Sequence, residues 1–370
     1  MKLDTTRRIV IGSVLRPVDD HRMYEKLGLG LLACHKHEIH IVGSLGKKGV
    51  RSKNIAFHEL FNFERLSGRR FLAPISFFRK LIQLKPEVVI VNSPDILIVS
   101  CAYKIIFGSL LVYDVLENYY ANVMFANTYR AFVRHILAHG VRFVEQVTRP
   151  FIDEYWIAER AYKEELPFVR SKFRIIENKF ALVSDVLVRP RRGIYRLLYS
   201  GTIAESYGIF NAIALVKYLH SIDPRFELTI VGFAGQLSVR KRLVEEVSGC
   251  NFISLVGIDR YVGHQDIIRY IQNADIGLLP YQVNQATVNR IPTKFYEYLA
   301  LLLPFVVAKE PFWEKELLPY SSQVRFYNFS QVCYDGFISL LRDLYINTNT
   351  INFRSSYYTT IFSNYKKFYC

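Results

Sequence analysis

The chain has 370 residues and a formal net charge of +15, and 51% of its residues are apolar while 22% are charged. This length exceeds one ordinary core and predicts two domains, while the composition excludes a disordered or low-complexity protein. The most apolar region, residues 86–115, is interrupted by Asn92, Asp95 and Lys104 and predicts no membrane span. Five cysteines without paired spacing, and an N-terminus that runs directly into a strand-like segment, predict a cytoplasmic protein without a secretory signal.

Positive charge is concentrated in the first half of the chain. Residues 1–190 hold 29 Lys and Arg against 19 Asp and Glu, and residues 47–85 hold ten basic residues against two acidic ones. Phe71, Phe77 and Phe78 lie in the same segment. We expect this region to contact an anionic membrane surface, with the protein peripheral at the inner face of the plasma membrane. A solvated basic face and a nucleic-acid site have similar compositions, although we expect no nucleic-acid partner.

Short β-branched segments alternate with helical patterns in this half. A strand is expected at residues 7–14, and apolar residues at three- and four-residue steps predict a helix at residues 20–35. Further strands are expected at residues 38–43, 87–93, 109–115, 153–158 and 172–178. Residues 181–194 follow neither period and predict a linker after an N-terminal domain of residues 1–180.

The same alternation begins again after the linker. Strands are expected at residues 195–201, 226–232, 252–257 and 275–281, with a helix at 208–222. Apolar strands separated by helices predict parallel sheets that are covered on both faces. We therefore expect an α/β protein with two Rossmann-like β/α/β domains that face each other across a cleft. Residues 195–345 would form the second domain, and residues 346–370 a C-terminal helix that packs back on the first.

Residues 291–307, with the sequence IPTKFYEYLALLLPFVV, place two charged residues at the start of an apolar segment. The first half has a helical pattern, and the second half reads as a buried strand. Lys294 and Glu297 would be costly there unless they meet partners or a ligand. A carboxylate can accept both hydroxyls of a vicinal diol, and a helix beginning near Thr293 offers amides to a phosphate. Alternatively, Thr293 caps this helix and Glu297 is solvated.

Three segments in the second half carry a family resemblance. YSGTIAESYGIFNAI, VGIDRYVGHQDIIRYIQNADIGLLPY and residues 291–307 resemble, in order and spacing, the second domain of the retaining GT-B glycosyltransferases of family GT4. In the first half, RPVDDHRMYEKLGLGLLACHKHEIHIV and LLVYDVLENYY look like that family's opening loop, helix, second strand and later strand end. The resemblance covers residues 7 to about 330. It implies a metal-independent enzyme that moves a sugar, with retention, from a nucleotide-sugar on the second domain to an acceptor on the first.

The resemblance also implies how the donor is bound. Glu297 would accept hydrogen bonds from the ribose hydroxyls, and Gly201 would let the backbone approach a phosphate, unless this glycine merely ends a strand. The family has basic residues where this chain has Thr202 and Tyr207. A UDP- or GDP-sugar would then depend on other cations, or the donor would be a CMP-sugar with one phosphate; no permanently bound cofactor is expected. The expected donor-binding residues are Gly201, Thr202, Tyr281, Arg290, Thr293, Lys294 and Glu297.

Two further departures affect the reacting centre. Asn289 stands where many family members have a sugar-contacting glutamate, and Leu116 replaces a usual histidine. We expect Glu117 and Asn289 to be the polar residues at the reacting centre, although Glu117 could instead cap the following helix. The expected acceptor-side residues are Arg16, Asp20 and Arg22, and Asp20 is also suited to cap the next helix.

A metal site is not expected. The chain has no D-x-D motif, since Asp19 and Asp20 are adjacent. Residues 34–40, CHKHEIH, gather a cysteine and three histidines, but neighbouring residues of an extended strand point to opposite faces and do not converge on one ion.

The sequence thus predicts a glycosyltransferase that acts on a glycan or lipid-linked acceptor, in bacterial capsule, O-antigen or exopolysaccharide synthesis. Two alternatives stay open. A sugar-nucleotide epimerase of the same architecture would act on the donor alone. A catalytically silent scaffold or binding protein would show the departures at Leu116, Asn289 and Thr202.

Overall fold

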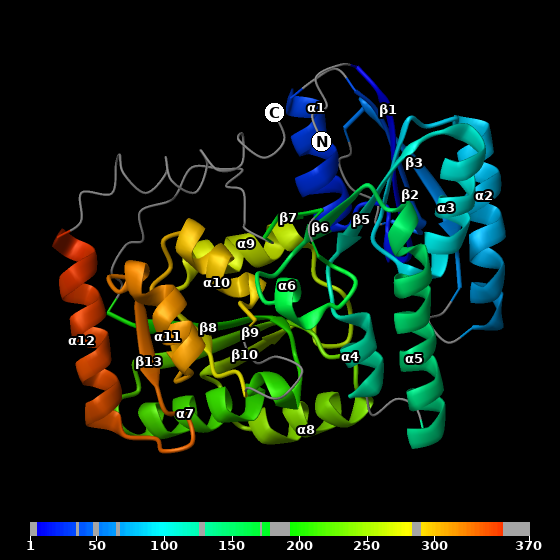
Figure 1. The fold of residues 1–370 in the computed structure, drawn as a ribbon. Helices are drawn as coiled ribbons and strands as arrows, with labels where there is room; N and C mark the ends of the chain where they lie inside the picture. The colour runs from blue at the N-terminus through cyan, green and yellow to red at the C-terminus, as the bar shows by residue number, and fades with distance from the viewer. Residues whose placement is uncertain are drawn as a thin grey trace. The chain divides into compact units, whose positions relative to one another are not determined.

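The structure is a computed structural model that describes residues 6–34, 37–46, 52–63, 67–125, 130–170, 172–177, 193–282 and 290–350. The described chain divides into two compact units, residues 6–177 and 193–350, each built on one parallel sheet (Figure 1). Two Rossmann-like α/β domains were predicted, and this fold class is confirmed. Most of the predicted linker and the predicted terminal helix beyond residue 350 lie outside the described residues.

The sheet of unit 1 has the strand order β3-β2-β1-β4-β5-β6-β7 among the described residues. Its strands are β1 (Arg8–Pro17), β2 (Glu38–Ser44), β3 (Ile55–Phe61), β4 (Val88–Val91), β5 (Leu110–Val115), β6 (Glu154–Ile157) and β7 (Phe173–Ile175). The connections contain η1 (His21–Gly28, a π-helix), α1 (Leu29–Cys34), η2 (Gly68–Leu72), α2 (Ala73–Leu84), η3 (Pro94–Ile96), α3 (Leu97–Phe107), α4 (Tyr119–Met124), α5 (Ala131–Thr148), η4 (Arg149–Phe151) and α6 (Tyr162–Glu165).

Both faces of this sheet are covered, which explains its continuous apolar strands. One apolar cluster joins the sheet to α2 and α3, and another joins its opposite face to η1 and α1. A methyl group on Gly12 of β1 would lie 2.5 Å from the ring of Phe77, so α2 packs closely on the strand. Phe77 is fully buried, and its predicted membrane contact is therefore wrong. The prediction also missed β3, which lies within the basic segment.

The sheet of unit 2 has the order β10-β9-β8-β11-β12-β13 among the described residues. Its strands are β8 (Tyr195–Thr202), β9 (Phe226–Phe233), β10 (Ile253–Val256), β11 (Ile276–Leu279), β12 (Phe305–Ala308) and β13 (Val324–Tyr327). The helices are η5 (Glu205–Tyr207), α7 (Ile209–Ile222), α8 (Leu237–Val247), α9 (His264–Asn273), α10 (Thr293–Ala300), α11 (Pro311–Leu317), η6 (Leu318–Tyr320) and α12 (Tyr334–Thr350). Apolar clusters join α7, α8 and α12 to one face and α9, α10 and α11 to the other.

The segment 291–307 folds as predicted, with α10 followed directly by β12. Phe295 and Tyr298 of α10 are fully buried against the sheet, which accounts for the apolar character of this helix. None of the helices in the described part of the chain is long and apolar enough to span a membrane.

Candidate functional site

Each sheet reverses its direction of growth at one point, and ligands bind at such points outside the carboxyl ends of the strands. In unit 2 this point lies between β8 and β11, which pair in parallel. In unit 1 it lies between β1 and β4, which also pair in parallel. A binding site is therefore expected among the residues that follow these four strands.

Lys294 and Glu297 form a buried ion pair in the first turns of α10 in unit 2. Lys294 Nζ lies 2.5 Å from Glu297 Oε2, and only 11% and 8% of the two side chains are exposed. His264 Nε2, at the start of α9, lies 3.5 Å from Glu297 Oε1. Burial alone would raise the pKa of Glu297, but Lys294 and His264 outweigh it and lower this pKa to about 2. Glu297 is therefore an ionised, acceptor-only group at neutral pH.

Gly201 brings Lys294 to the end of β8. Its φ of +113° lies in the region that favours glycine, and a methyl group there would approach Lys294 Cε to 2.8 Å. A methyl group on the neighbouring Gly232 of β9 would lie 1.7 Å from the Gly201 carbonyl oxygen, so the two strand ends are also in close contact. Lys294 thus places a cation beside Gly201, although Thr202, the next residue, carries no charge and is exposed.

The start of α10 differs from one of the two predictions made for it. The N-cap residue is Pro292, which makes no side-chain capping bond, and Thr293 is the first helical residue. Because Glu297 is buried, the alternative in which Thr293 caps the helix above a solvated Glu297 is wrong. The first N–H groups of a helix have no partners within it, so this end can donate to an anion.

Two other predicted donor-binding residues, Arg290 and Tyr281, lie next to side chains that pack around α10. Trp313 of α11 donates its Nε1–H to the carbonyl oxygen of Arg290, at 2.7 Å. The ring of Tyr281, just after β11, lies 5.3 Å from the ring of Tyr207 and 6.3 Å from that of Trp313. These contacts fix the chain on both sides of residues 283–289, which lie outside the described residues together with the predicted Asn289.

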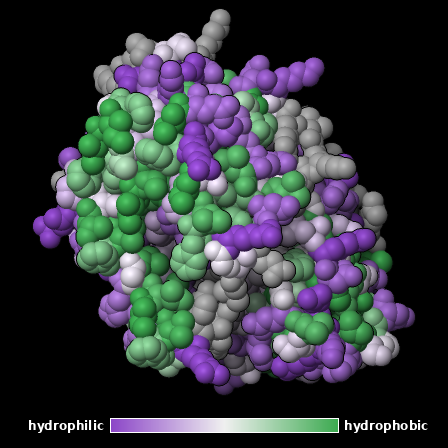
Figure 2. All heavy atoms as spheres, turned by 90° about the vertical axis from the view of Figure 1, so that its right-hand side faces the viewer, coloured by the Kyte–Doolittle hydropathy of each residue, from purple (hydrophilic) through white to green (hydrophobic). Residues whose placement is uncertain are grey.

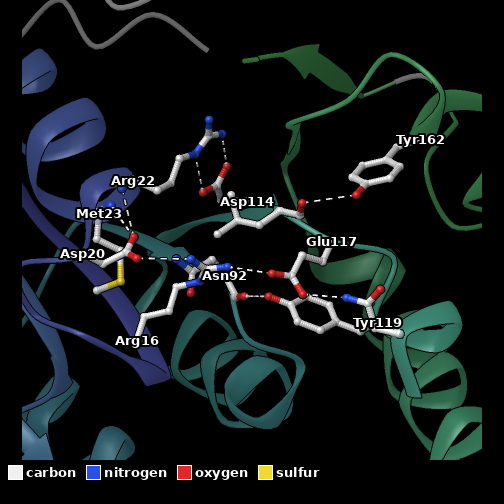
Figure 3. Close-up of polar contacts among 11 residues, drawn as sticks. Arg16, Asp20, Arg22, Met23, Asn92, Asp114, Glu117, Tyr119 and Tyr162 are labelled. Atoms are coloured by element: carbon white, nitrogen blue, oxygen red, sulfur yellow. Dashed lines mark hydrogen bonds and ion pairs between the residues drawn. The ribbon is translucent and has the colours of Figure 1, made fainter. Parts of the chain in front are cut away.

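In unit 1, Arg16 joins the loop after β1 to the loop after β5 (Figure 3). Its guanidinium contacts Asp20 Oδ2 at 3.1 Å and Glu117 Oε1 at 2.9 Å. Asp20 also accepts from the backbone N–H groups of Arg22 and Met23, at 2.9 Å and 3.2 Å, which confirms that it caps the helix η1.

Glu117 does not cap the helix that follows it. Asn118 is the N-cap of α4, accepting from Ala121 N–H at 3.2 Å. Glu117 instead accepts from Asn122 Nδ2 at 2.6 Å, and 43% of its side chain is exposed. The alternative capping role of Glu117 is therefore wrong, and the carboxylate is accessible beside Arg16. Leu116, where the resemblance would place a histidine, is buried.

Arg22 has a supporting position. It donates to both oxygens of Asp114 on β5, at 3.1 Å and 2.5 Å, and to the carbonyl oxygen of Ile176, at 2.7 Å. Both charged side chains are buried. This arrangement fits a residue that holds the loop in place better than one that contacts an acceptor directly.

The prediction missed Asn92, which follows β4 beside this cluster (Figure 3). Its side chain is buried, at 2% exposed, yet neither atom of its amide has a hydrogen-bond partner within the described residues. Its backbone carbonyl accepts from Tyr119 O–H at 2.5 Å. A buried amide without partners is costly, so the side chain of Asn92 is a candidate to bind a ligand group or a water at this edge of the sheet. The sequence did contain a sign of Asn92, because a polar residue directly follows the apolar strand VVIV. His264 was also missed, although it is a polar residue at the start of a predicted helix.

The histidines of residues 34–40 separate as expected on a strand. His37 Nδ1 accepts from Arg7 N–H at 3.2 Å, whereas His40 lies 3.0 Å from His58 Nε2 and 3.0 Å from Glu38 Oε1. The side chain of Cys34 and the whole of His35 lie outside the described residues. Within the described residues, His37 and His40 thus have separate partners.

No protein-family model matches the sequence, and no curated protein matches it either. Solved structures do match. Sucrose-phosphate synthase from Thermosynechococcus elongatus superposes with a TM-score of 0.65 at 14% identity, over 92% of this chain and 90% of that one. HepE from Anabaena, solved with UDP and glucose, gives 0.59 at 12% identity over 98% of each chain. A UDP-N-acetylglucosamine 2-epimerase from Listeria monocytogenes, described as putative, gives 0.57 at 10% identity over 91% and 88%.

The chain has the GT-B fold. Identities this low show the fold and not the reaction. Within this GT-B chain, both clusters of polar residues lie where the respective sheet reverses, Lys294 and Glu297 near the end of β8 and Arg16, Asn92 and Glu117 near the ends of β1, β4 and β5.

Proposed function

We propose that this protein is a glycosyltransferase that takes its sugar from a nucleotide-sugar. The observation that carries the proposal is the buried Lys294–Glu297 pair beside Gly201, at the carboxyl edge of the second sheet. A buried ion pair adds little stability compared with apolar residues of the same size, so its presence at this edge is better explained by a ligand. HepE, of the same fold, was solved with UDP and with glucose.

Each part of this site would bind one part of the donor. Glu297, ionised at neutral pH, would accept hydrogen bonds from the two ribose hydroxyls. Lys294, Arg290 and the N–H group of Thr293 would hold the phosphates, and Gly201 would let the backbone approach them closely. Thr202 and Tyr281 would border this site. A UDP- or GDP-sugar would place two phosphates beside these groups. A CMP-sugar, with one phosphate, remains the alternative because Thr202 is neutral and adds no positive charge.

The reaction would proceed with retention and without a metal. The bond between the sugar and the leaving phosphate would break first, the phosphate would stabilise the developing oxocarbenium ion, and the acceptor hydroxyl would attack on the same face and give its proton to that phosphate. Lys294 and the helix start would stabilise the leaving charge. Glu117 and Asn289 would contact the sugar, and Arg16, Asp20 and Asn92 would orient the acceptor.

The acceptor would be a glycan or a lipid-linked saccharide of bacterial surface polysaccharide synthesis. The basic character of residues 47–85 supports a protein that works in the cytoplasm, attached peripherally to an anionic membrane.

Thermal unfolding with UDP, GDP, TDP, ADP and CMP tests the donor site. A nucleotide at one hundred times its Kd should stabilise the protein by about 2.7 kcal/mol. Glu297→Gln, which keeps the size of the side chain, should abolish this shift, and Glu314→Gln, an exposed glutamate on α11, should retain it. Stabilisation by CMP alone would indicate a monophosphate donor. If no nucleotide stabilises the wild type, the catalytically silent scaffold becomes the better interpretation.

A sugar-nucleotide epimerase is the second candidate, because the Listeria neighbour has the same fold at a similar TM-score. An epimerase would return the same nucleotide with one sugar centre inverted and would need no acceptor. A transferase would release free nucleotide only when an acceptor, or water in its place, takes the sugar. Product analysis by NMR on the stabilising nucleotide-sugar distinguishes the two.

A further inference from the structure

Helix α5 of unit 1 exposes an apolar stripe along its length. Phe132, Ile136, Phe143 and Val147 are 76%, 56%, 66% and 42% exposed. Their spacing of four, seven and four residues places them on one side of the helix. Gly140 lies on the same side, and a methyl group there would meet no atom within 4 Å, so the stripe is open along the helix. An exposed apolar stripe of this length requires an explanation.

The neighbouring helices extend this stripe into a broad surface. Helix α3 contacts both α2 and α5, so the three lie side by side on unit 1 (Figure 1). Exposed apolar side chains on α3, η2 and α2 are Ile98, Ile105, Phe107, Phe71, Ile75 and Ile82. Figure 2 views this side and shows hydrophobic side chains gathered among hydrophilic ones. We call it the α2–α3–α5 face.

The charge of this face is almost entirely positive. Residues 67–86 contain five basic residues and no acidic one, and residues 130–152 contain four basic residues and one acidic residue, Glu145. Glu145 lies on the buried side of α5, where it accepts from Tyr113 O–H at 3.0 Å and pairs with Arg142 at 3.2 Å. The flanking Asp95 and Asp153 are paired with Arg70 and Lys104. The exposed Arg69, Arg79 and Lys85 lie among the apolar side chains, so the face offers apolar contact together with a net positive charge.

We propose that the α2–α3–α5 face docks on an anionic lipid surface, with the apolar side chains entering the headgroup boundary and the basic ones contacting lipid phosphates. A second copy of the chain is a poorer occupant, because it would bring two positive faces together. This inference names the surface for the peripheral attachment proposed above. It does not depend on the donor site, so vesicle binding and nucleotide binding can fail independently.

Vesicle co-sedimentation of the full chain tests the inference. We expect binding to vesicles of phosphatidylcholine with phosphatidylglycerol, and at least tenfold weaker binding to phosphatidylcholine alone or at high salt. The triple variant F132S/I136S/F143S should lose most of the binding. Its matched control, L237S/V244S/L318S, removes three exposed apolar side chains of unit 2 and should bind like the wild type.

A second pair of variants tests the charge. R69Q/R79Q/K85Q should weaken binding on the order of a hundredfold, at about fivefold for each basic residue near the surface. K241Q/K309Q/K315Q removes the same charge from unit 2 and should bind like the wild type. Circular dichroism and the nucleotide-induced thermal shift report whether each variant is folded.

Three results would overturn the inference. The first is the absence of wild-type binding to anionic vesicles, and the second is equal binding by the α5 triple variant and its control. The third is a dimer of the wild type in sedimentation equilibrium that is lost in the α5 triple variant, when neither protein binds vesicles. Retention on duplex DNA that disappears with R69Q/R79Q/K85Q, without vesicle binding, would assign the face to nucleic acid instead.

Discussion

Lys294 Nζ and Glu297 Oε2 lie 2.5 Å apart in a part of unit 2 where both side chains are almost fully buried. Their charges compensate each other, so each makes the burial of the other tolerable. The pair also lies beside Gly201, at the edge of the sheet where a ligand would bind. Stability and binding can therefore be separated by changing the two residues one at a time and together.

Lys294→Met should destabilise unit 2 more than the loss of one ion pair suggests. It leaves Glu297 ionised and buried, which costs about 3–5 kcal/mol in such pairs. Lys294→Met with Glu297→Gln should recover most of this loss, because no charge then remains buried. Urea denaturation measures both, with Lys315→Met on the exposed face of α11 as the control.

Nucleotide binding should not recover in the double variant. If the double variant binds nucleotide as well as the wild type does, the pair has only a structural role. If Lys294→Met alone is as stable as the wild type, Glu297 has a further compensating partner, and His264 is the first candidate.

Stability should depend on acid pH through Glu297. Its pKa is about 2 in the folded protein against an ordinary value of 4.5. A carboxyl whose pKa is lowered on folding stabilises the protein fully above the unfolded value, and this contribution is lost as the pH falls from 4.5 towards 2. The difference corresponds to about 3 kcal/mol. The advantage of the wild type over Glu297→Gln in unfolding free energy should shrink between about pH 5 and about pH 3, whereas a constant difference would contradict the assignment.

Gly201→Ala should weaken nucleotide binding. Its φ of +113° and the 2.8 Å approach to Lys294 Cε mean that a methyl group both strains the backbone and displaces the lysine. Gly249→Ala is the matched control, since Gly249 also has a positive φ, +75°, but an open environment. Both should lose about 1 kcal/mol or more of stability, yet only Gly201→Ala should reduce the nucleotide-induced shift. Equal shifts would show that Lys294 does not take part in binding.

The fold was predictable because it depends on local patterns. Strands such as β4 and β11 are short apolar runs, and α7 repeats its buried residues every three or four positions. β3 was missed because its buried residues, Ile55 and Phe61, lie at its two ends and the exposed positions between them include Glu59. A strand at the edge of the sheet has a weaker pattern, since only part of it is covered.

The site was predictable only in part, because it depends on tertiary contacts. The sequence indicated that Lys294 and Glu297 needed a partner, but not that each would be the partner of the other. The spacing between Arg16 and Glu117 is 101 residues, so no local pattern could have shown their contact. Phe77 and Phe71 look alike in sequence, yet one is fully buried and the other is 86% exposed. Whether such a side chain is buried depends on whether it points towards the sheet, which the sequence alone does not show.

Asn92→Ala should lower activity without lowering stability. The backbone contacts of Asn92 with Gly12 and Tyr119 do not involve its side chain, so they remain. The buried amide has no described partner, and its removal therefore loses no hydrogen bond within the described protein. We expect the free energy of unfolding to stay within about 1 kcal/mol of the wild type. The transfer rate should fall roughly 5- to 30-fold, because a ligand group that meets the amide would lose about 1–2 kcal/mol of interaction. A variant that loses several kcal/mol of stability but transfers sugar at the wild-type rate per folded molecule would assign Asn92 to packing and remove it from the site.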